Sequence, residues 1–220
     1  MTAAARQART SEFPDSLLDG YRSFRDHRSE PERARYRALA EHGQTPEVMV
    51  IACCDSRSAP ETIFGAAPGE IFVVRNVANL VPPREPDSGC HGVAAALEFA
   101  VQGLKVRHVV VLGHGRCGGI RAALHPPAEP LSPDDFIGRW MKQLGPVTSL
   151  VAGGSLTDAE RQTALERASI RASVANLRTF PCVSNLESRD RLGLHGAWFD
   201  IADGDLWTMD PADGEFFKAD

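Results

Sequence analysis

The chain has 220 residues and a formal net charge of −5 at pH 7, with 43% hydrophobic and 24% charged residues. A chain of this length can bury the core of one large domain. The negative balance argues against nucleic acid and anionic membrane surfaces as partners. No apolar run approaches the roughly 18–20 residues that span a bilayer. Composition therefore predicts a globular domain with neither kind of partner.

The N-terminal segment and the cysteines bear on location. Met1 to Asp15 lacks the apolar core of a secretory signal, and we expect a disordered tail there. The chain has five cysteines, an odd number, which without such a signal favours reduced thiols and a cytoplasmic protein. Cys54, Cys90 and Cys182 are expected to be small buried apolar residues.

Helices are predicted where apolar side chains recur at helical spacing. Thr157 and Glu160 form a capping box at the start of the longest helix, and Pro181 helps to stop it. Ser132 and Pro133 predict a further helix start, with Ser132 as the N-cap. The predicted helices cover residues 14–27, 30–41, 92–104, 118–125 and 157 to about 179.

Strands are predicted at short apolar runs bounded by turn residues. Asp203-Gly204 is typical of a β-hairpin turn and joins the last two strands. Residues 58–69 and 76–86 are expected to be connecting segments. The predicted strands cover residues 48–52, 70–75, 108–112, 194–202 and 205–209.

The alternation of strands and helices predicts an α/β fold. We expect a mostly parallel central β-sheet flanked by helices, with an antiparallel C-terminal hairpin at one edge. No repeat or linker divides the chain, so residues 1–220 are expected to form one domain with an N-terminal helical arm over residues 1–42. The arm precedes every strand and has little of the domain to pack on. We therefore expect it to pack on a partner subunit, with packing on its own sheet as the alternative.

Two predicted strands end in side chains that bind metals: one in Cys53-Cys54-Asp55-Ser56-Arg57, the other in Gly113-His114-Gly115-Arg116-Cys117. Side chains alternate along an extended segment, so Cys53, Asp55 and Arg57 point one way and Cys54 the other. Ligand sites of open α/β sheets lie at the carboxyl ends of the strands. Two sulfurs, one imidazole and one carboxylate are therefore expected at a common edge, and this donor set favours zinc.

The fourth position of this site decides its chemistry. Two thiolates and a neutral histidine already balance the charge of Zn²⁺, and Asp55 as a fourth ligand would close the site. Water in that position would instead supply zinc-bound hydroxide, because zinc enzymes lower the pKa of bound water to roughly 7. Arg57 can hold both oxygens of Asp55 in a planar fork and keep them off the metal. From the residues alone, an inert site and a catalytic site both remain open.

The paired motifs resemble those of the β-class carbonic anhydrases. The resemblance runs from about Gly43 to Asp200 and is carried by Cys53 to Arg57 and His114 to Gly119. It implies that zinc is bound by Cys53, His114 and Cys117. It also implies that Asp55 and Arg57 form a catalytic dyad in the reversible hydration of carbon dioxide to bicarbonate. The family resemblance further implies a homodimer or higher homo-oligomer, with N-terminal helices crossing to the other subunit and the active site at the interface.

The subclass follows from the same resemblance. In Gly43-Gln44-Thr45-Pro46, Gln44 matches a glutamine that reaches the active site across the dimer in the plant-like subclass. The bicarbonate-inhibited subclass binds its effector with a Trp–Arg–Tyr set, and the matching positions here are Val50, Arg75 and Phe199. We therefore expect an enzyme without that allosteric site. A histidine that some relatives carry is Gly103 here, which leaves the proton shuttle open. The expected substrate pocket consists of Gln44, Phe72, Val77, Phe99 and Gly118.

Two other functions compete with this interpretation. The first is hydrolysis of carbon disulfide or carbonyl sulfide on the same scaffold. The sequence distinguishes this activity poorly from the hydration of carbon dioxide. The second is a structural zinc site in a protein without activity, in which Asp55 and Arg57 would be an ordinary ion pair. A structural site has four committed ligands and does not require Arg57.

Overall fold

The computed structural model describes residues 13–85, 89–151, 153 and 155–219. The chain separates into two compact units, Met1–Gly43 and Gln44–Asp220. The first unit contains α1 (Asp15–Asp26) and α2 (Glu30–His42), which confirms both predicted N-terminal helices. Most of the predicted disordered tail lies outside the described residues, but Asp15 already belongs to α1. The assignment of residues 1–220 to one domain with an arm over 1–42 stays a prediction.

The second unit is built on a six-stranded sheet with the strand order β2-β1-β3-β4-β5-β6. Its strands are β1 (Val48–Cys53), β2 (Ile71–Asn76), β3 (His108–His114), β4 (Gly193–Phe199), β5 (Leu206–Met209) and β6 (Phe216–Lys218). The strands from β2 to β4 pair in parallel, and β5 and β6 add antiparallel pairs at one edge. The predicted α/β fold and its edge hairpin are confirmed.

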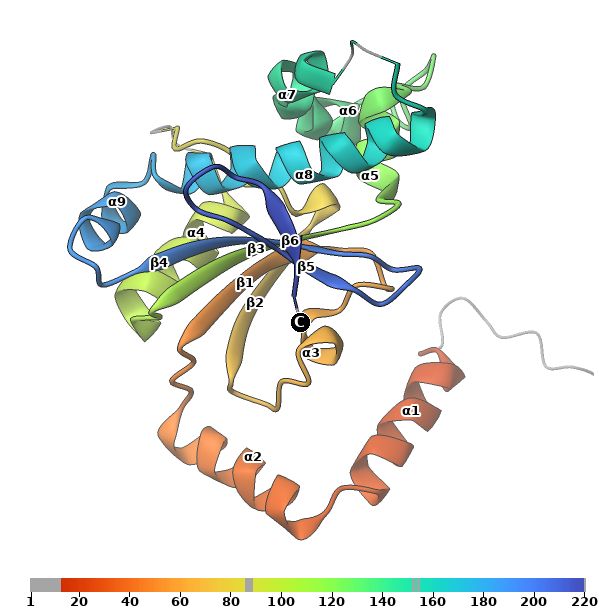
Figure 1. The fold of residues 1–220 in the computed structure, drawn as a ribbon. Coiled ribbons are helices and arrows are strands. Elements are labelled where there is room, and N and C mark those ends of the chain that lie inside the picture. Colours follow the sequence, from red (N-terminus) through yellow and green to blue (C-terminus); the bar gives the residue numbers. More distant parts are fainter. Residues whose placement is uncertain (1–12, 86–88, 152, 154, 220) are drawn as a thin grey trace, which may run out of the picture. The chain divides into compact units, whose positions relative to one another are not determined.

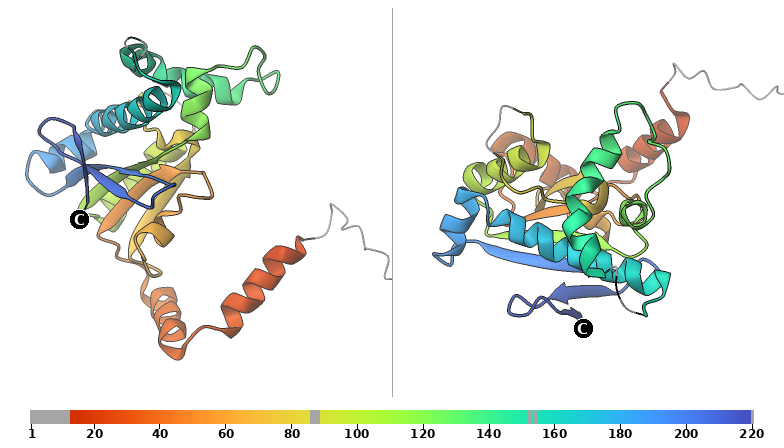
Figure 2. Two further views of the ribbon diagram at one scale, coloured as in Figure 1. Left: turned by 45° about the vertical axis from the view of Figure 1, so that its right-hand side comes forward. Right: turned by 90° about the horizontal axis from the view of Figure 1, so that it is seen from above.

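Helices cover one face of this sheet (Figures 1 and 2). They are α4 (Gly92–Glu98), its continuation as a π-helix over Phe99–Leu104, α8 (Asp158–Leu177) and α9 (Pro181–Glu187). Leu97 of α4 and Ile170 of α8 are fully buried against β-strand residues such as Ile51 and Val111. The opposite face carries α3 (Pro60–Ile63) and a smaller buried cluster around Val50 and Leu112.

A second helical group lies beyond the carboxyl ends of β1 and β3. It contains α5 (Gly118–Leu124), α6 (Phe136–Met141), a 3-10 turn over Lys142–Leu144 and α7 (Gly145–Val151). These elements share a buried cluster with the first half of α8, and this cluster includes Cys53, Cys117 and Leu165. In the described part of the chain, every helix is too short or too polar to cross a membrane.

Some local predictions were wrong or incomplete. Ser132 is not the N-cap of α6, because residues 132–135 form a turn in which the amide of Asp135 donates to the carbonyl of Ser132 at 3.0 Å. Asp135 caps the helix instead, with φ 47° and its carboxylate accepting from the amide of Gly138 at 3.1 Å. Pro181 begins α9, a helix that the sequence did not predict. The strand β6 and the short helix α3 were also not predicted.

The expected burial of the remaining cysteines is also wrong. Cys54 and Cys90 are exposed and Cys182 is half-buried. Cys54 follows the last residue of β1 and so lies beyond the part of the strand that is buried on both faces. Cys90 lies in the segment before α4, where no core forms around it.

Candidate metal centre

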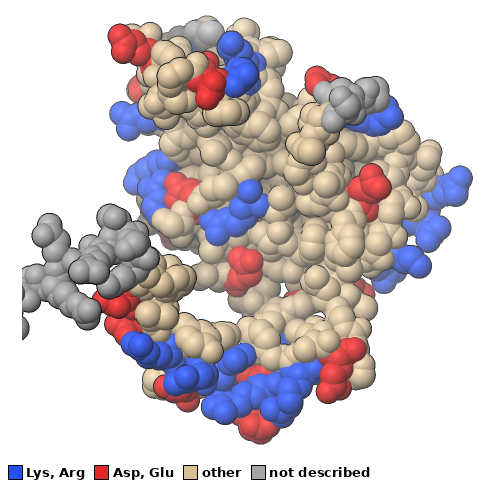
Figure 3. Space-filling view, turned by 180° about the vertical axis from the view of Figure 1, so that it is seen from behind, with Lys and Arg blue, Asp and Glu red and all other residues tan. Residues whose placement is uncertain are grey.

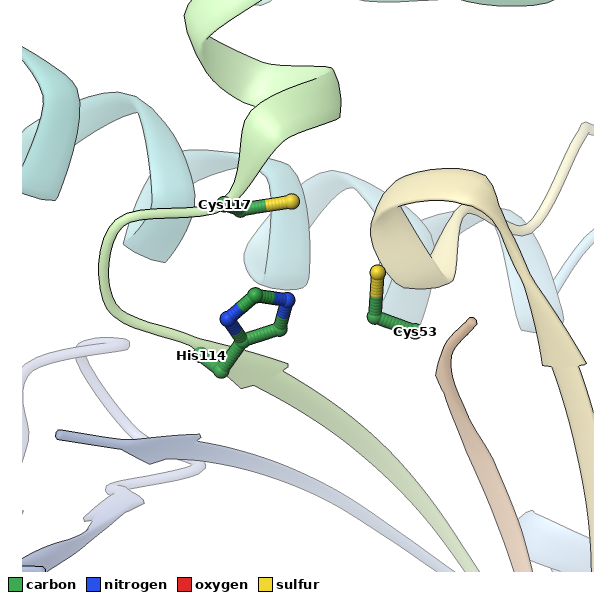
Figure 4. Close-up of side chains that lie close together, drawn as sticks. All are labelled: Cys53, His114 and Cys117. Atoms are coloured by element: carbon green, nitrogen blue, oxygen red, sulfur yellow. The ribbon is translucent and has the colours of Figure 1, made fainter. Parts of the chain in front are cut away.

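Three donor atoms from distant parts of the chain meet at the carboxyl end of the sheet. Cys53 ends β1, His114 ends β3, and Cys117 precedes the first residue of α5. Their ligand atoms all lie within 4.8 Å of one another and all three residues are buried. Figure 4 shows the two sulfurs and one imidazole nitrogen directed toward a common point. The structure therefore brings these three predicted residues together.

The hydrogen bonding of His114 leaves one imidazole nitrogen available for a cation. The Nδ1 of His114 lies 3.0 Å from the carbonyl oxygen of Gly115, an acceptor that fixes the proton on this nitrogen. Its buried Nε2 has no hydrogen-bond partner among the described residues. A buried polar nitrogen without a partner is costly unless it binds a ligand. Tetrahedral zinc, with bonds of about 2.0–2.3 Å, holds its ligand atoms roughly 3.5–3.8 Å apart. The three donor atoms lie within 4.8 Å of one another, so small shifts of the side chains would let them bind zinc.

The two thiols are electrostatically coupled. The hydrogen bond with Cys117 lowers the pKa of Cys53. The same contact, together with burial, raises the pKa of Cys117. The sulfur of Cys53 also accepts the backbone amide of Asp55 at 3.4 Å. A pair of sulfurs that shares one proton releases it when a divalent cation binds.

Beside these donors, Asp55 is held by Arg57 in a two-pronged ion pair. Arg57 donates from Nε to Oδ1 at 2.9 Å and from the terminal Nη2 to Oδ2 at 2.7 Å, and its backbone amide adds a bond of 3.0 Å to Oδ1. These bonds hold the pKa of Asp55 well below its usual range. Oδ2 of Asp55 lies 4.0 Å from Nε2 of His114. The carboxylate thus borders the three donors with both oxygens bound to another group.

A further arginine organises the loop, and the sequence did not predict this role. Arg75 of β2 donates from Nε to the carbonyl of Cys53 at 2.7 Å and from Nη2 to the carbonyl of Asp55 at 2.6 Å. Next to it, the side chain of Asn76 forms two hydrogen bonds with the backbone of Leu80, at 2.8 and 3.0 Å. The only available signal was the place of Arg75 at the end of a strand that pairs with the Cys53 strand.

The start of α5 comes very close to the turn that follows β2. A Cβ on Gly119 would lie 2.9 Å from Cγ1 of Val77 and 3.1 Å from Cβ of Ala78. Ala78 itself has φ 64°, an uncommon conformation for a residue with a side chain. Only glycine permits this approach at position 119, and the approach brings Cys117 toward Cys53.

The predicted substrate-pocket residues divide into two groups. Gly118 follows Cys117 in the chain, and Val77 follows Asn76, the strand residue that pairs with Cys53. The rings of Phe72 and Phe99 contact each other with centroids 5.8 Å apart. However, Phe72 stands four residues before Asn76, which pairs with Cys53, a separation of about 13 Å along the strand.

Gln44 is exposed and precedes β1, at the strand end opposite to Cys53. With β1 six residues long, its two ends lie about 17 Å apart. Within one chain, Gln44, Phe72 and Phe99 are therefore not brought to the three donors.

A buried group of two cysteines and one histidine at the carboxyl edge of a parallel sheet is a donor set that suits zinc. The fold and the site together describe the class of zinc-binding α/β proteins. A family model described as carbonic anhydrase matches residues 48–206. "Beta carbonic anhydrase 5, chloroplastic" of Arabidopsis thaliana is 37% identical over 215 residues, which are 96% of this chain and 69% of that protein. "Beta carbonic anhydrase 6, mitochondrial" of the same plant is 34% identical over 209 residues, or 93% of this chain and 71% of that protein. The chain therefore belongs to the β-class of the carbonic anhydrase family.

Solved structures agree with this assignment. The β-carbonic anhydrase CcaA superposes with a TM-score of 0.85 at 28% identity, covering 94% of this chain and 92% of that one. One of two tetrameric β-carbonic anhydrases from Sordaria macrospora superposes with a TM-score of 0.71 at 30% identity, covering 88% and 92% of the two chains. The similarity thus includes the whole sheet and the helices around it.

Proposed function

We propose that this protein catalyses the reversible hydration of carbon dioxide to bicarbonate and a proton, with zinc held by Cys53, His114 and Cys117. Membership of the family and the chemistry of the three donors support the activity. The observation that carries the proposal is the ion pair between Arg57 and Asp55 beside the donors. A structural site would use the carboxylate as its fourth ligand, whereas here an arginine binds both of its oxygens.

Bound zinc would supply Lewis acidity that lowers the pKa of a water molecule. The protein supplies the orientation. Asp55, ionised because Arg57 stabilises its charge, can only accept hydrogen bonds. Its Oδ2 faces the donor group and accepts a hydrogen bond from the attacking oxygen, which directs a lone pair of that oxygen at the carbon of carbon dioxide. By binding both oxygens, Arg57 would keep the carboxylate from becoming a further ligand of bound zinc.

The substrate pocket is proposed to be completed by a second copy of the chain. Val77 and Gly118 each follow a predicted ligand or the strand partner of one in the chain, whereas Gln44, Phe72 and Phe99 do not reach the three donors of their own chain. Phe99 is 54% exposed and Val77 is 37% exposed, an unusual degree for apolar residues that line a pocket within a single chain. An interface at which a second chain contributes Gln44, Phe72 and Phe99 would complete the pocket. It would also cover the exposed side chains.

The helical arm supports the same assembly. Neither α1 nor α2 has a buried residue. Leu17, Tyr21 and Phe24 repeat at helical spacing along α1 and are 58%, 57% and 46% exposed. Charged side chains of both signs lie along the face of the two helices seen in Figure 3. An amphipathic helix with its apolar face uncovered is stabilised by packing. We assign this face to a partner subunit in a homodimer or higher homo-oligomer.

We further propose that the protein belongs to the plant-like subclass without allosteric bicarbonate inhibition. Val50, one of the three positions of the effector set, is 1% exposed in the core. The guanidinium of Arg75, a second position, binds the carbonyls of Cys53 and Asp55. Neither is arranged to hold bicarbonate. The cytoplasmic location stays a prediction, since two relatives are named chloroplastic and mitochondrial.

The test is a stopped-flow assay of carbon dioxide hydration with metal analysis on the same sample. We expect about one zinc per chain and a rate that disappears when a chelator removes the metal and returns when zinc is added. Full activity after metal removal would contradict the proposal, as would a purified protein that binds no zinc.

A further inference from the structure

Helix α8 carries two polar side chains that face the loop holding Cys117. Gln162 and Glu166 are four residues apart and therefore lie on the same side of the helix. Glu166 is only 2% exposed, although glutamate is rarely buried without partners. Sequence analysis assigned neither residue a role, and the proposed reaction does not use them.

Both backbone polar groups of Cys117 are bound by this pair. The amide of Cys117 donates to Oε1 of Glu166 at 2.9 Å. The carbonyl of Cys117 accepts from Nε2 of Gln162 at 3.2 Å. The same Nε2 lies 3.0 Å from Oε1 of Glu166, so that the two side chains hold each other as well as the cysteine.

The second carboxylate oxygen of Glu166 binds a side chain of the sheet. Oε2 accepts from Nε1 of Trp198 on β4 at 3.1 Å. A Cβ on Gly115 would lie 3.1 Å from the ring of Trp198, so this ring forms the wall against which the loop after His114 runs. Arg167, the next residue of α8, contacts the same ring, with its guanidinium carbon 4.7 Å from the centre of the Trp198 ring.

All three contacts of the buried carboxylate are donors, so a carboxylate fits this position and a neutral amide or alkyl group does not. Burying such a group is costly, and the loop that it binds is itself constrained, with Arg116 at φ 57°. A carboxylate that binds the backbone of a ligand residue fixes the direction of its side chain, as groups behind metal ligands commonly do.

We propose that Glu166, supported by Gln162, is a positioning residue that orients Cys117 for metal binding. The inference rests on the proposed function, because it assumes that Cys117 is a zinc ligand. It assigns the buried part of α8 a second role beside packing on the sheet.

The test compares Glu166→Leu, Glu166→Gln and Gln162→Leu with the wild type. Zinc affinity is measured by competition with a chelator, and the orientation of the cysteines by the sulfur-to-metal absorption of the cobalt-substituted protein. We expect Glu166→Leu to lower zinc affinity about 10- to 100-fold and to change the cobalt spectrum. Glu166→Gln keeps one acceptor for the amide of Cys117 but places an amide group against a donor, and should lose less. Gln162→Leu, which releases the carbonyl of Cys117 and one contact of Glu166 but leaves the bond to the amide of Cys117, should also lose less.

Val174→Ala is the matched control. Val174 is 2% exposed on the same helix, and eight residues, about 12 Å, separate it from Glu166. It should lower stability without changing zinc affinity or the cobalt spectrum. The inference fails if Glu166→Leu, or both milder variants when Glu166→Leu does not fold, bind zinc and cobalt as the wild type does. If the wild type itself binds no zinc, the proposed function fails instead, so the two failures are distinguishable.

Discussion

The ion pair between Arg57 and Asp55 lies beside the three metal-binding side chains. The carboxylate lies 4.0 Å from the imidazole nitrogen of His114, near enough to compete for a metal. The guanidinium binds both of its oxygens, at 2.9 and 2.7 Å, and charge-assisted pairs of this geometry are stronger than neutral hydrogen bonds. With half of the Arg57 side chain exposed, solvent screens the pair. We therefore propose that the pair directs Asp55 more than it stabilises the fold.

Arg57→Ala is expected to give a folded, zinc-loaded protein whose hydration rate is lower by about 10²-fold or more. Without the guanidinium, the carboxylate of Asp55 is free to turn to the metal and occupy the open position. Stopped-flow kinetics and metal analysis on the same sample measure both effects. Arg191→Ala is the control, because Arg191 is exposed and precedes β4 at the other end of the sheet. An Arg57→Ala protein with the wild-type rate would indicate that the pair is only structural.

The pH dependence of the rate follows from the same pair. Because Arg57 holds the pKa of Asp55 below its usual range, Asp55 is ionised at every pH above that range and does not titrate near neutrality. The attacking water must lose a proton, so we expect the rate to rise with pH between about 6.5 and 9. A pH series of initial rates measures this rise. A flat profile would contradict the proposed attack by an activated water.

At the scale of elements, capping decided where helices begin. The predicted capping box at Thr157 forms, and the structure adds a second one at Ser29 that the sequence analysis did not name. The weaker Ser132 signal does not form a cap, because Asp135 is closer to the helix and accepts the amide of Gly138. Local hydrogen bonding thus selects among neighbouring candidates that sequence spacing leaves equivalent.

Thr157→Ala is expected to lower the free energy of unfolding by about 1 kcal/mol, because it removes the side chain that caps the twenty-residue helix α8. Ser132→Ala is the matched control and should change it by less than about 0.5 kcal/mol. Chemical denaturation of the two variants measures the difference. Equal losses would mean that the cap at Thr157 contributes nothing specific.

At the scale of the whole molecule, the uncovered face of α1 is the main feature that a single chain does not explain. Replacing Leu17 and Phe24 together by Asp should shift the protein toward monomer in sedimentation velocity and lower the hydration rate, since the proposed pocket needs residues from a partner. Ser23→Asp adds a charge elsewhere on α1 and should leave the assembly intact. An unchanged sedimentation coefficient in the double variant would remove the arm from the interface.

Regulation is also a property of the assembled molecule. We expect hydration to show no cooperative inhibition when bicarbonate is titrated near neutral pH, because Val50 is buried and Arg75 is bound to loop carbonyls. Initial rates over a bicarbonate series measure this. Sigmoidal inhibition would assign the protein to the regulated subclass.

The sequence by itself determined the α/β class, the parallel strands and the meeting of Cys53, His114 and Cys117. Apolar runs of strand length and the rule that parallel strands end at one edge are local and topological facts, which spacing encodes. The same holds for the Thr157 capping box and the Asp203-Gly204 hairpin.

Only the tertiary structure decided which side chains support the site. Arg75, Gln162 and Glu166 act through contacts between residues distant in sequence, the longest of them 49 positions apart. No periodicity records such contacts. The exposure of Cys54 and Cys90 and the capping by Asp135 likewise depend on how loops pack. Burial and hydrogen bonding are set by the neighbours that folding brings together, and these neighbours are absent from any local pattern.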